Sequence, residues 1–313
     1  MTRIPRTSLD VFPLNLGANP FGWTADREET FAILDAFVAD GGNFLDTADS
    51  YSAWADGNSG GESESLIGDW LQERGTRAEM IIATKVGGKP SHKGLARETV
   101  LSALDASLER LQIDQIDLYY FHHDDESVAI ADQVATSQEI LESGKVKHVA
   151  LSNYTPGRMR EFFETARDTK ATLPVAIQPH YNLIHRRDFE AKYRPIAREF
   201  QVAVFPYFAL ASGVLTGKYH SKADIEGQAR QGFAEELITE SSLAVVDELT
   251  RIATKRKSEP STIALAWLLA KGVTAPIASV SEPGQLAALM AATKVELSTE
   301  EVEQLDKVSA PFA

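Results

Sequence analysis

The sequence contains no cysteine, no long hydrophobic run and a shortage of positive charge. Without cysteine the chain can form no disulfide, no thiolate nucleophile and no cysteine-ligated zinc site, and this composition suits a reducing compartment. No apolar run approaches membrane-spanning length, and the N-terminal residues lack the apolar segment of a signal peptide. We therefore expect a cytoplasmic protein.

The charge balance also limits the kinds of partner. The chain has 31 Lys and Arg against 45 Asp and Glu, which gives a formal net charge of −14. Nucleic acids and anionic membranes attract basic surfaces, so neither is an expected partner. A small-molecule substrate is the better expectation.

Short β-type segments alternate with helical patterns along the whole sequence. The segments are 12–17, 43–46, 80–84, 116–121, 146–151, 175–178, 202–206 and 274–279. The gaps between them are long enough for helices, and start signals stand at Asp26, Thr155 and Glu259. Eight strand-helix units predict a (β/α)8 barrel, and no linker divides residues 1–313 into more than one domain.

An open doubly wound sheet is the competing arrangement. It would usually carry a Gly-x-Gly-x-x-Gly turn after the first strand, whereas this sequence has only Gly17 and Gly22 there. The segment "ASGVLTGKY" is not a phosphate loop either, because three residues separate Gly213 from Gly217 and Tyr219 follows Lys218. The barrel is therefore favoured.

Polar residues stand at three consecutive strand ends, where a barrel has its active face. Asp46 ends the second strand and Tyr51 follows in "DTADSY", Lys85 ends the third, and His122 ends the fourth. We expect Lys85 to lower the pKa of the Tyr51 phenol, with Asp46 keeping the ammonium charged. Because adjacent residues of a strand point in opposite directions, only one of His122 and His123 should join this group.

A metal-dependent barrel hydrolase or isomerase is an alternative for the same strand ends. Its ligands would come from His122, His123, Asp124, Asp125 and His180. No His-x-His or His-Glu-x-x-His spacing is present, so no metal is expected.

Several of these stretches, taken together, resemble the aldo-keto reductase family over nearly the whole chain. They are "DTADSY", "ATKVGG", "DLYYFHHDD", "VALSNYTP", "IQPHYNLIHR", "ASGVLTGKY" and "VELSTEEVEQLD". The resemblance implies the catalytic tetrad Asp46, Tyr51, Lys85 and His122. It also implies hydride transfer from a nicotinamide cofactor to the carbonyl of an aldehyde, ketone or keto-sugar, with Tyr51 as proton donor.

The resemblance also implies a cofactor site across the barrel mouth. Its residues would be Trp23, Asp46, Ser152, Asn153, Gln178, Tyr207, Phe208, Leu210, Ser212, Gly213, Lys218, Arg230, Ser279, Ser281 and Gln285. NADPH is the cofactor that the family favours. Ser281 stands where many NADPH-dependent relatives have an arginine for the 2′-phosphate, and Glu282 follows it, which leaves NADH open.

The expected substrate pocket is less specific. Trp23, Tyr51, Trp54 and His123 would line it, and aromatic walls suit both sugar rings and apolar carbonyl compounds. A further alternative is a non-enzymatic subunit that keeps the fold as a cofactor sensor, as some relatives bound to potassium channels do.

Overall fold

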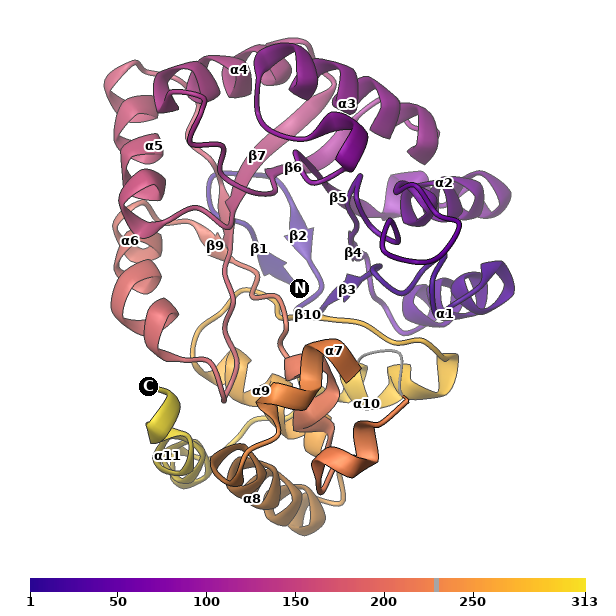
Figure 1. The fold of residues 1–313 in the computed structure, drawn as a ribbon, viewed down its shortest axis with the longest axis vertical. Coiled ribbons are helices and arrows are strands. Elements are labelled where there is room, and N and C mark those ends of the chain that lie inside the picture. Colours follow the sequence, from indigo (N-terminus) through magenta and orange to yellow (C-terminus); the bar gives the residue numbers. More distant parts are fainter. Residues whose placement is uncertain (228–230) are drawn as a thin grey trace.

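The computed structural model describes residues 1–227 and 231–313 and shows eight parallel strands curled into a barrel with helices around it (Figure 1). The strands are β3 (Asn15–Gly17), β4 (Phe44–Asp46), β5 (Ile81–Val86), β6 (Ile116–Phe121), β7 (Val146–Ser152), β8 (Ala176–Gln178), β9 (Ala203–Val204) and β10 (Ile277–Ala278). Neighbours pair in the order β10-β3-β4-β5-β6-β7-β8-β9. The N–H of Thr274 donates to the carbonyl oxygen of Val204 at 2.9 Å and joins the two edges. The predicted (β/α)8 fold is confirmed.

Helices connect the strands as the sequence pattern predicts. They are α1 (Arg27–Ala39), α2 (Glu62–Arg74), α3 (Arg97–Leu111), α4 (Ile130–Glu142), α5 (Pro156–Asp168), α6 (Arg194–Glu199), α7 (Gln231–Ala234), α8 (Glu240–Arg256), α9 (Pro260–Ala270), α10 (Leu286–Ala291) and α11 (Thr299–Val308). The predicted starts are confirmed at Asp26, Thr155 and Glu259, which are the N-caps of α1, α5 and α9. Within the described residues, no helix combines the length and the apolarity that crossing a bilayer would need.

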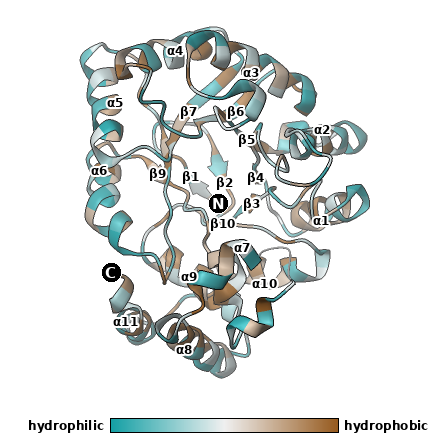
Figure 2. Ribbon diagram, in the orientation of Figure 1, coloured by the Kyte–Doolittle hydropathy of each residue, from teal (hydrophilic) through white to brown (hydrophobic). Residues whose placement is uncertain are grey.

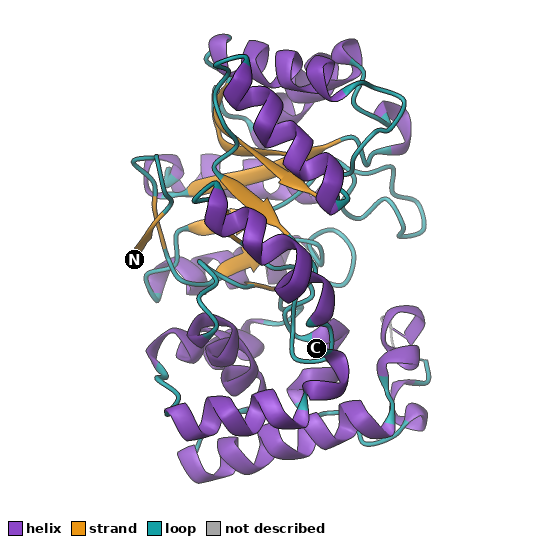
Figure 3. Ribbon diagram, turned by 90° about the vertical axis from the view of Figure 1, so that its left-hand side faces the viewer, coloured by secondary structure: helices purple, strands orange, loops and turns teal. Residues whose placement is uncertain are grey.

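An N-terminal hairpin, which the sequence pattern did not predict, closes one end of the barrel. It pairs β1 (Thr2–Arg3) with β2 (Asp10–Val11) in antiparallel fashion. Ile4, Leu9 and Val11 belong to the same buried cluster as the side chains inside the barrel. Figure 3 shows this hairpin at one end of the strands and long connecting loops at the other. The second end is therefore the one left for binding.

Strand alternation divides the core into an inner and an outer part. Phe44, Ala83 and Tyr120 lie in the inner cluster, whereas their chain neighbours Leu45, Ile82 and Tyr119 pack against the helices. This is the period of two expected for strands. Figure 2 shows the helices presenting hydrophilic residues on the outside of the ring.

A group of buried charged side chains links α2 and α3 to the outer, helix-facing side of β5. Glu64 of α2 is fully buried, accepts a hydrogen bond from Thr84 at 2.5 Å and pairs with Arg110 of α3 at 2.7 Å. Asp49 is also buried, but its two oxygens find no hydrogen-bond partner of normal geometry within the described residues. Burial, and next the nearby Glu64, raise the pKa of Asp49 to about 7. The folded protein therefore holds a proton here that the unfolded chain releases at lower pH.

This raised pKa predicts that Asp49→Asn stabilises the protein in mildly alkaline solution. Because the folded pKa lies above the ordinary value of 3.8, stability falls as pH rises from 3.8 to about 7 and stays reduced above it. The free energy of unfolding of the variant should exceed that of wild type by on the order of 2–4 kcal/mol at about pH 8. The two proteins should differ little in stability near pH 4. Urea denaturation at both pH values measures this, and Asp56→Asn on the surface is the control. Equal stabilities at the higher pH would contradict the burial argument.

Candidate active site

The candidate site is a ring of side chains at the open end of the barrel. Each member lies two residues after an inward-facing core residue, at or just beyond the end of its strand. The pairs are Phe44 and Asp46, Ala83 and Lys85, Tyr120 and His122, Ala150 and Ser152, Ala176 and Gln178, Phe205 and Tyr207, and Ile277 and Ser279. The alternation that fills the barrel with apolar side chains thus delivers polar ones to its mouth.

Lys85 occupies the centre of this ring. Its side chain is completely buried, and its ammonium donates to Asp46 Oδ1 at 2.5 Å, to the Thr47 carbonyl at 2.7 Å and to the Tyr51 hydroxyl at 2.7 Å. Burial lowers the pKa of Lys85, and the Asp46 carboxylate opposes that effect. The three N–H groups of an ammonium therefore all have acceptors, which favours the charged form.

Asp46 shares its carboxylate among three partners. Oδ1 accepts from Lys85 and, at 3.2 Å, from the Tyr51 hydroxyl, while Oδ2 accepts from the Gln178 amide at 2.8 Å. Residues from β4, β5 and β8 meet here, and the sequence separation between Asp46 and Gln178 is 132 residues. The structure brings together Asp46, Tyr51 and Lys85 as expected.

The expected effect on the Tyr51 phenol is wrong in direction. Burial raises the pKa of Tyr51 well above its ordinary value of 10.0, and the charge of Asp46 is the next cause. The nearby Lys85 ammonium does not reverse this, because burial penalises the charged phenolate and the Asp46 carboxylate repels it. Tyr51 therefore keeps its proton at neutral pH.

His122 joins the group edge-on to the Tyr51 ring, at a centroid distance of 6.2 Å. Its Nδ1 is buried without a hydrogen-bond partner in the described part of the chain. Burial lowers the pKa of His122 well below 6.5, with the charge of Lys85 as the second cause. The ring is therefore a neutral imidazole with an unused polar atom.

The expectation that His122 and His123 point in opposite directions is also wrong. Their rings stack at 4.4 Å, because β6 ends at Phe121 and both residues lie beyond the regular strand. His123 is exposed, and burial of part of its ring lowers its pKa. Both rings thus lie at the mouth.

Ser152, Asn153 and Tyr207 form a second hydrogen-bonded group. The Asn153 amide donates to the His122 carbonyl at 2.8 Å, and its oxygen accepts from the Tyr207 hydroxyl at 2.9 Å. Asn153 has a φ of 54°, which asparagine tolerates better than most residues. The Ser152 hydroxyl donates to the carbonyl of Gln178 at 3.0 Å.

The loop after β9 makes an unusual series of turns. Phe208, Ala211, Ser212 and Gly213 all have positive φ, and Phe208 is 45% exposed. A Cβ on Gly213 would lie 3.4 Å from the Lys218 ammonium, which places that charge beside the turn. Successive turns of this kind form concave surfaces that receive anions. Leu210 is half-buried in the same loop, and Arg230 lies outside the described residues.

The expected adenosine end follows β10, which adjoins β9 in the closed barrel. The Ser279 hydroxyl donates to Asn19 at 2.6 Å, and a Cβ on Gly17 would lie 2.5 Å from the Ser279 oxygen, so only glycine fits there. The Ser281 hydroxyl lies 3.0 Å from that of Thr24, and the side-chain oxygen of Gln285 accepts from the Ser281 N–H at 3.1 Å. These hydroxyls supply hydrogen bonds but no positive charge.

Aromatic rings line the side of the mouth near Tyr51. Trp54 packs edge-on against Trp23 at 5.7 Å and against Tyr51 at 6.1 Å, and it is 47% exposed. Asn58 donates to the Gly22 carbonyl at 2.7 Å and ties the loop of Trp54 to that of Trp23. Of the expected substrate-binding residues, Trp23, Tyr51 and Trp54 therefore lie side by side, and His123 stacks on His122.

The residues of the metal alternative are engaged elsewhere. Asp124 pairs with Arg158, and Asp125 accepts from the N–H of Leu95 at 2.9 Å. Across residues 1–227 and 231–313, no group of three or more His, Asp or Glu side chains is placed to hold a metal ion.

Sequence reasoning missed one feature of this site. The sequence pattern assigns His180 only to the metal alternative, but its ring stacks on Tyr207 at 5.2 Å and on His185 at 3.7 Å. No spacing rule reveals such a stack, because Tyr207 lies beyond the end of the next strand, β9. The available signal was the position of His180 two residues after Gln178.

Comparison with known proteins agrees with the fold and the site. Residues 13–310 match the Aldo/keto reductase family. Aldo-keto reductase str7 of Strobilurus tenacellus is 31% identical, over 92% of this chain and 83% of its own. L-glyceraldehyde 3-phosphate reductase of Escherichia coli O157:H7 is 30% identical, over 97% of this chain and 89% of its own. A probable voltage-gated potassium channel subunit beta of Oryza sativa subsp. japonica is 29% identical, over 97% of this chain and 94% of its own. The chain therefore belongs to the aldo/keto reductase family and is an NAD(P)H-dependent oxidoreductase that reduces carbonyl groups.

Proposed function

We propose that the protein reduces an aldehyde, ketone or keto-sugar with NADPH, using Asp46, Tyr51, Lys85 and His122 as its catalytic residues. The observation that carries this proposal is the pair of hydrogen bonds from the buried Lys85 ammonium to the Tyr51 hydroxyl and to Asp46. A charged lysine is costly to bury, so its place beside a phenol at a barrel mouth favours a catalytic role.

The residues at the mouth fit a dinucleotide cofactor. Tyr207 and Phe208 offer aromatic surface for a nicotinamide ring, and Phe208 is 45% exposed. The turns at Ser212 and Gly213 lie beside the ammonium of Lys218, which suits a pyrophosphate. Ser152, Asn153 and Gln178 carry the hydroxyl and amide groups that suit a carboxamide. When bound, the reduced nicotinamide would supply the hydride.

Tyr51 would supply the proton of the reaction. Its raised pKa keeps the phenol protonated until negative charge develops on the substrate oxygen. The proton then moves from the Tyr51 oxygen to that oxygen, and the Lys85 ammonium, 2.7 Å away, stabilises the phenolate left behind. The neutral His122 ring can donate a hydrogen bond to the same substrate oxygen and orient the carbonyl.

The substrate would lie between Tyr51 and the aromatic wall. Trp23, Trp54 and His123 give this wall large ring surfaces, which suits carbonyl compounds with a ring or an apolar side. A regulatory role is the second candidate, because a relative of similar identity is named as a potassium channel subunit beta. Cofactor binding without turnover of any aldehyde, ketone or keto-sugar would favour that role.

Removal of one hydroxyl tests the proposed proton donor. Tyr51→Phe should lower kcat by about a hundredfold to ten-thousandfold, because it removes a positioned acid. Binding of NADPH, measured by fluorescence titration, should stay within about twofold of wild type, since the phenol is not expected to hold the cofactor. Turnover is followed by the loss of reduced-nicotinamide absorbance with a panel of carbonyl compounds.

The matched control is Tyr119→Phe, which removes a buried hydroxyl on the outer, helix-facing side of β6. Its kcat should equal that of wild type. Unchanged turnover in Tyr51→Phe would remove Tyr51 from the proposed role.

A second experiment tests the cofactor. We expect wild type to bind NADPH more tightly than NADH, and Ser281→Arg to strengthen NADPH binding further, by about tenfold, through a charged contact to the 2′-phosphate. NADH binding should hardly change, since it lacks that phosphate. Fluorescence titration with both cofactors measures this. A wild-type protein that binds NADH more tightly would contradict NADPH as its cofactor.

A further inference from the structure

We propose that His180 and His185 are positioning residues that fix the ring plane of Tyr207 for cofactor binding. This inference rests on the proposed function, in which Tyr207 is the surface for the nicotinamide ring. The plane of the Tyr207 ring must be defined for stacking, and the hydrogen bond of its hydroxyl does not define that plane alone.

One hydrogen bond leaves the ring of Tyr207 free to turn. Its hydroxyl donates to Asn153 at 2.9 Å, which holds the far end of the side chain. That bond lies near the axis about which a phenol ring rotates, and this torsion has only a broad preference in tyrosine. A second contact on the ring face is needed to define its plane.

The His180 ring supplies that contact. It stacks on Tyr207 with 5.2 Å between centroids and 23° between planes. The backbones also meet, because the Tyr207 N–H donates to the Pro179 carbonyl at 3.0 Å. The ring contact and the backbone contact together place His180 against the expected nicotinamide surface.

His185 in turn holds His180. The two imidazoles lie 3.7 Å apart with an angle of only 7° between them. A tight turn brings them together, in which Asn182 and His185 exchange backbone hydrogen bonds at 3.3 and 3.1 Å. The result is a column of three rings in the order His185, His180, Tyr207.

The column is electrically neutral, which allows close stacking. Burial lowers the pKa of His180 to about 3, and the neighbouring His185 is the second cause. Burial also lowers the pKa of His185, against a smaller opposing effect of Asp188. Neutral rings at 3.7 Å avoid the repulsion that two imidazolium ions would have.

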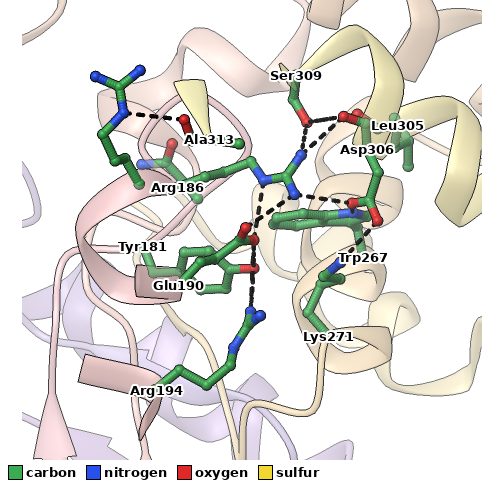
Figure 4. Close-up of polar contacts among 12 residues, drawn as sticks. Tyr181, Arg186, Glu190, Arg194, Trp267, Lys271, Leu305, Asp306, Ser309 and Ala313 are labelled. Atoms are coloured by element: carbon green, nitrogen blue, oxygen red, sulfur yellow. Dashed lines mark hydrogen bonds and ion pairs between the residues drawn. The ribbon is translucent and has the colours of Figure 1, made fainter. Parts of the chain in front are cut away.

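The segment that carries the two histidines is fixed at two points. Between the histidines, the Asn182 amide donates to the Phe208 carbonyl at 2.8 Å. Directly after His185, Arg186, which is 6% exposed, pairs with Glu190 and donates to the Asp306 carbonyl at 2.9 Å and to Ser309 at 2.8 Å (Figure 4). The helix α11 thus holds the segment in place, and the segment holds the column.

The experiment compares NADPH affinity in single and double variants. His180→Ala should weaken NADPH binding by about three- to tenfold, the size of an aromatic pair contact, while His180→Phe should keep it within about twofold of wild type. His185→Ala should weaken binding less than His180→Ala does. The double variant should be no weaker than His180→Ala, because His185 acts through His180.

Two further measurements separate positioning from general structure. Circular dichroism should give the same spectrum for all variants, and kcat at saturating NADPH should change less than the affinity does. Native affinity in His180→Ala, or loss of affinity in His180→Phe equal to that in His180→Ala, would overturn the inference. Tyr207→Ala tests the proposed function separately, because an unchanged NADPH affinity there would mean that Tyr207 is not part of the cofactor site.

Discussion

The ion pair between Lys85 and Asp46 is the interaction on which the rest of this site depends. Both side chains are completely buried, and removing such charges from water costs several kcal/mol for each. The cost is offset only if the remaining donors and acceptors find partners, and here they do. Lys85 has Thr47 and Tyr51 in addition to Asp46, and Asp46 has Gln178. Strands β4, β5 and β8 must therefore meet in one register for the pair to persist.

The same pair sets the protonation of its neighbours. Burial, and next the charge of Asp46, keep the phenol of Tyr51 protonated. Burial and the charge of Lys85 keep His122 neutral. The mouth thus combines a protonated phenol with a neutral imidazole, and both can give a hydrogen bond to a carbonyl oxygen. That combination serves reduction, in which a proton must be donated.

The sequence predicted the strands and the convergence of Asp46, Tyr51 and Lys85, because strand alternation and the common direction of parallel strands decide both. It did not predict the N-terminal hairpin, whose strands are only two residues long. The orientation of His122 and His123 also escaped prediction, since the alternation rule ends where β6 ends. The pKa of Tyr51 could not be read from neighbouring charges alone, because burial, which depends on the whole fold, is its largest cause. The stack of His180 on Tyr207 joins the segments that follow β8 and β9, and no spacing rule reveals it.

The most direct test of this account is a double-mutant cycle on the ion pair. The rate of hydride transfer from NADPH to an aromatic aldehyde would be measured in a single turnover for wild type, Lys85→Met, Asp46→Asn and the double variant. If the two residues act as one unit, the double variant reacts no more slowly than Lys85→Met alone. If the two losses multiply, Lys85 and Asp46 act independently, and the central claim is contradicted.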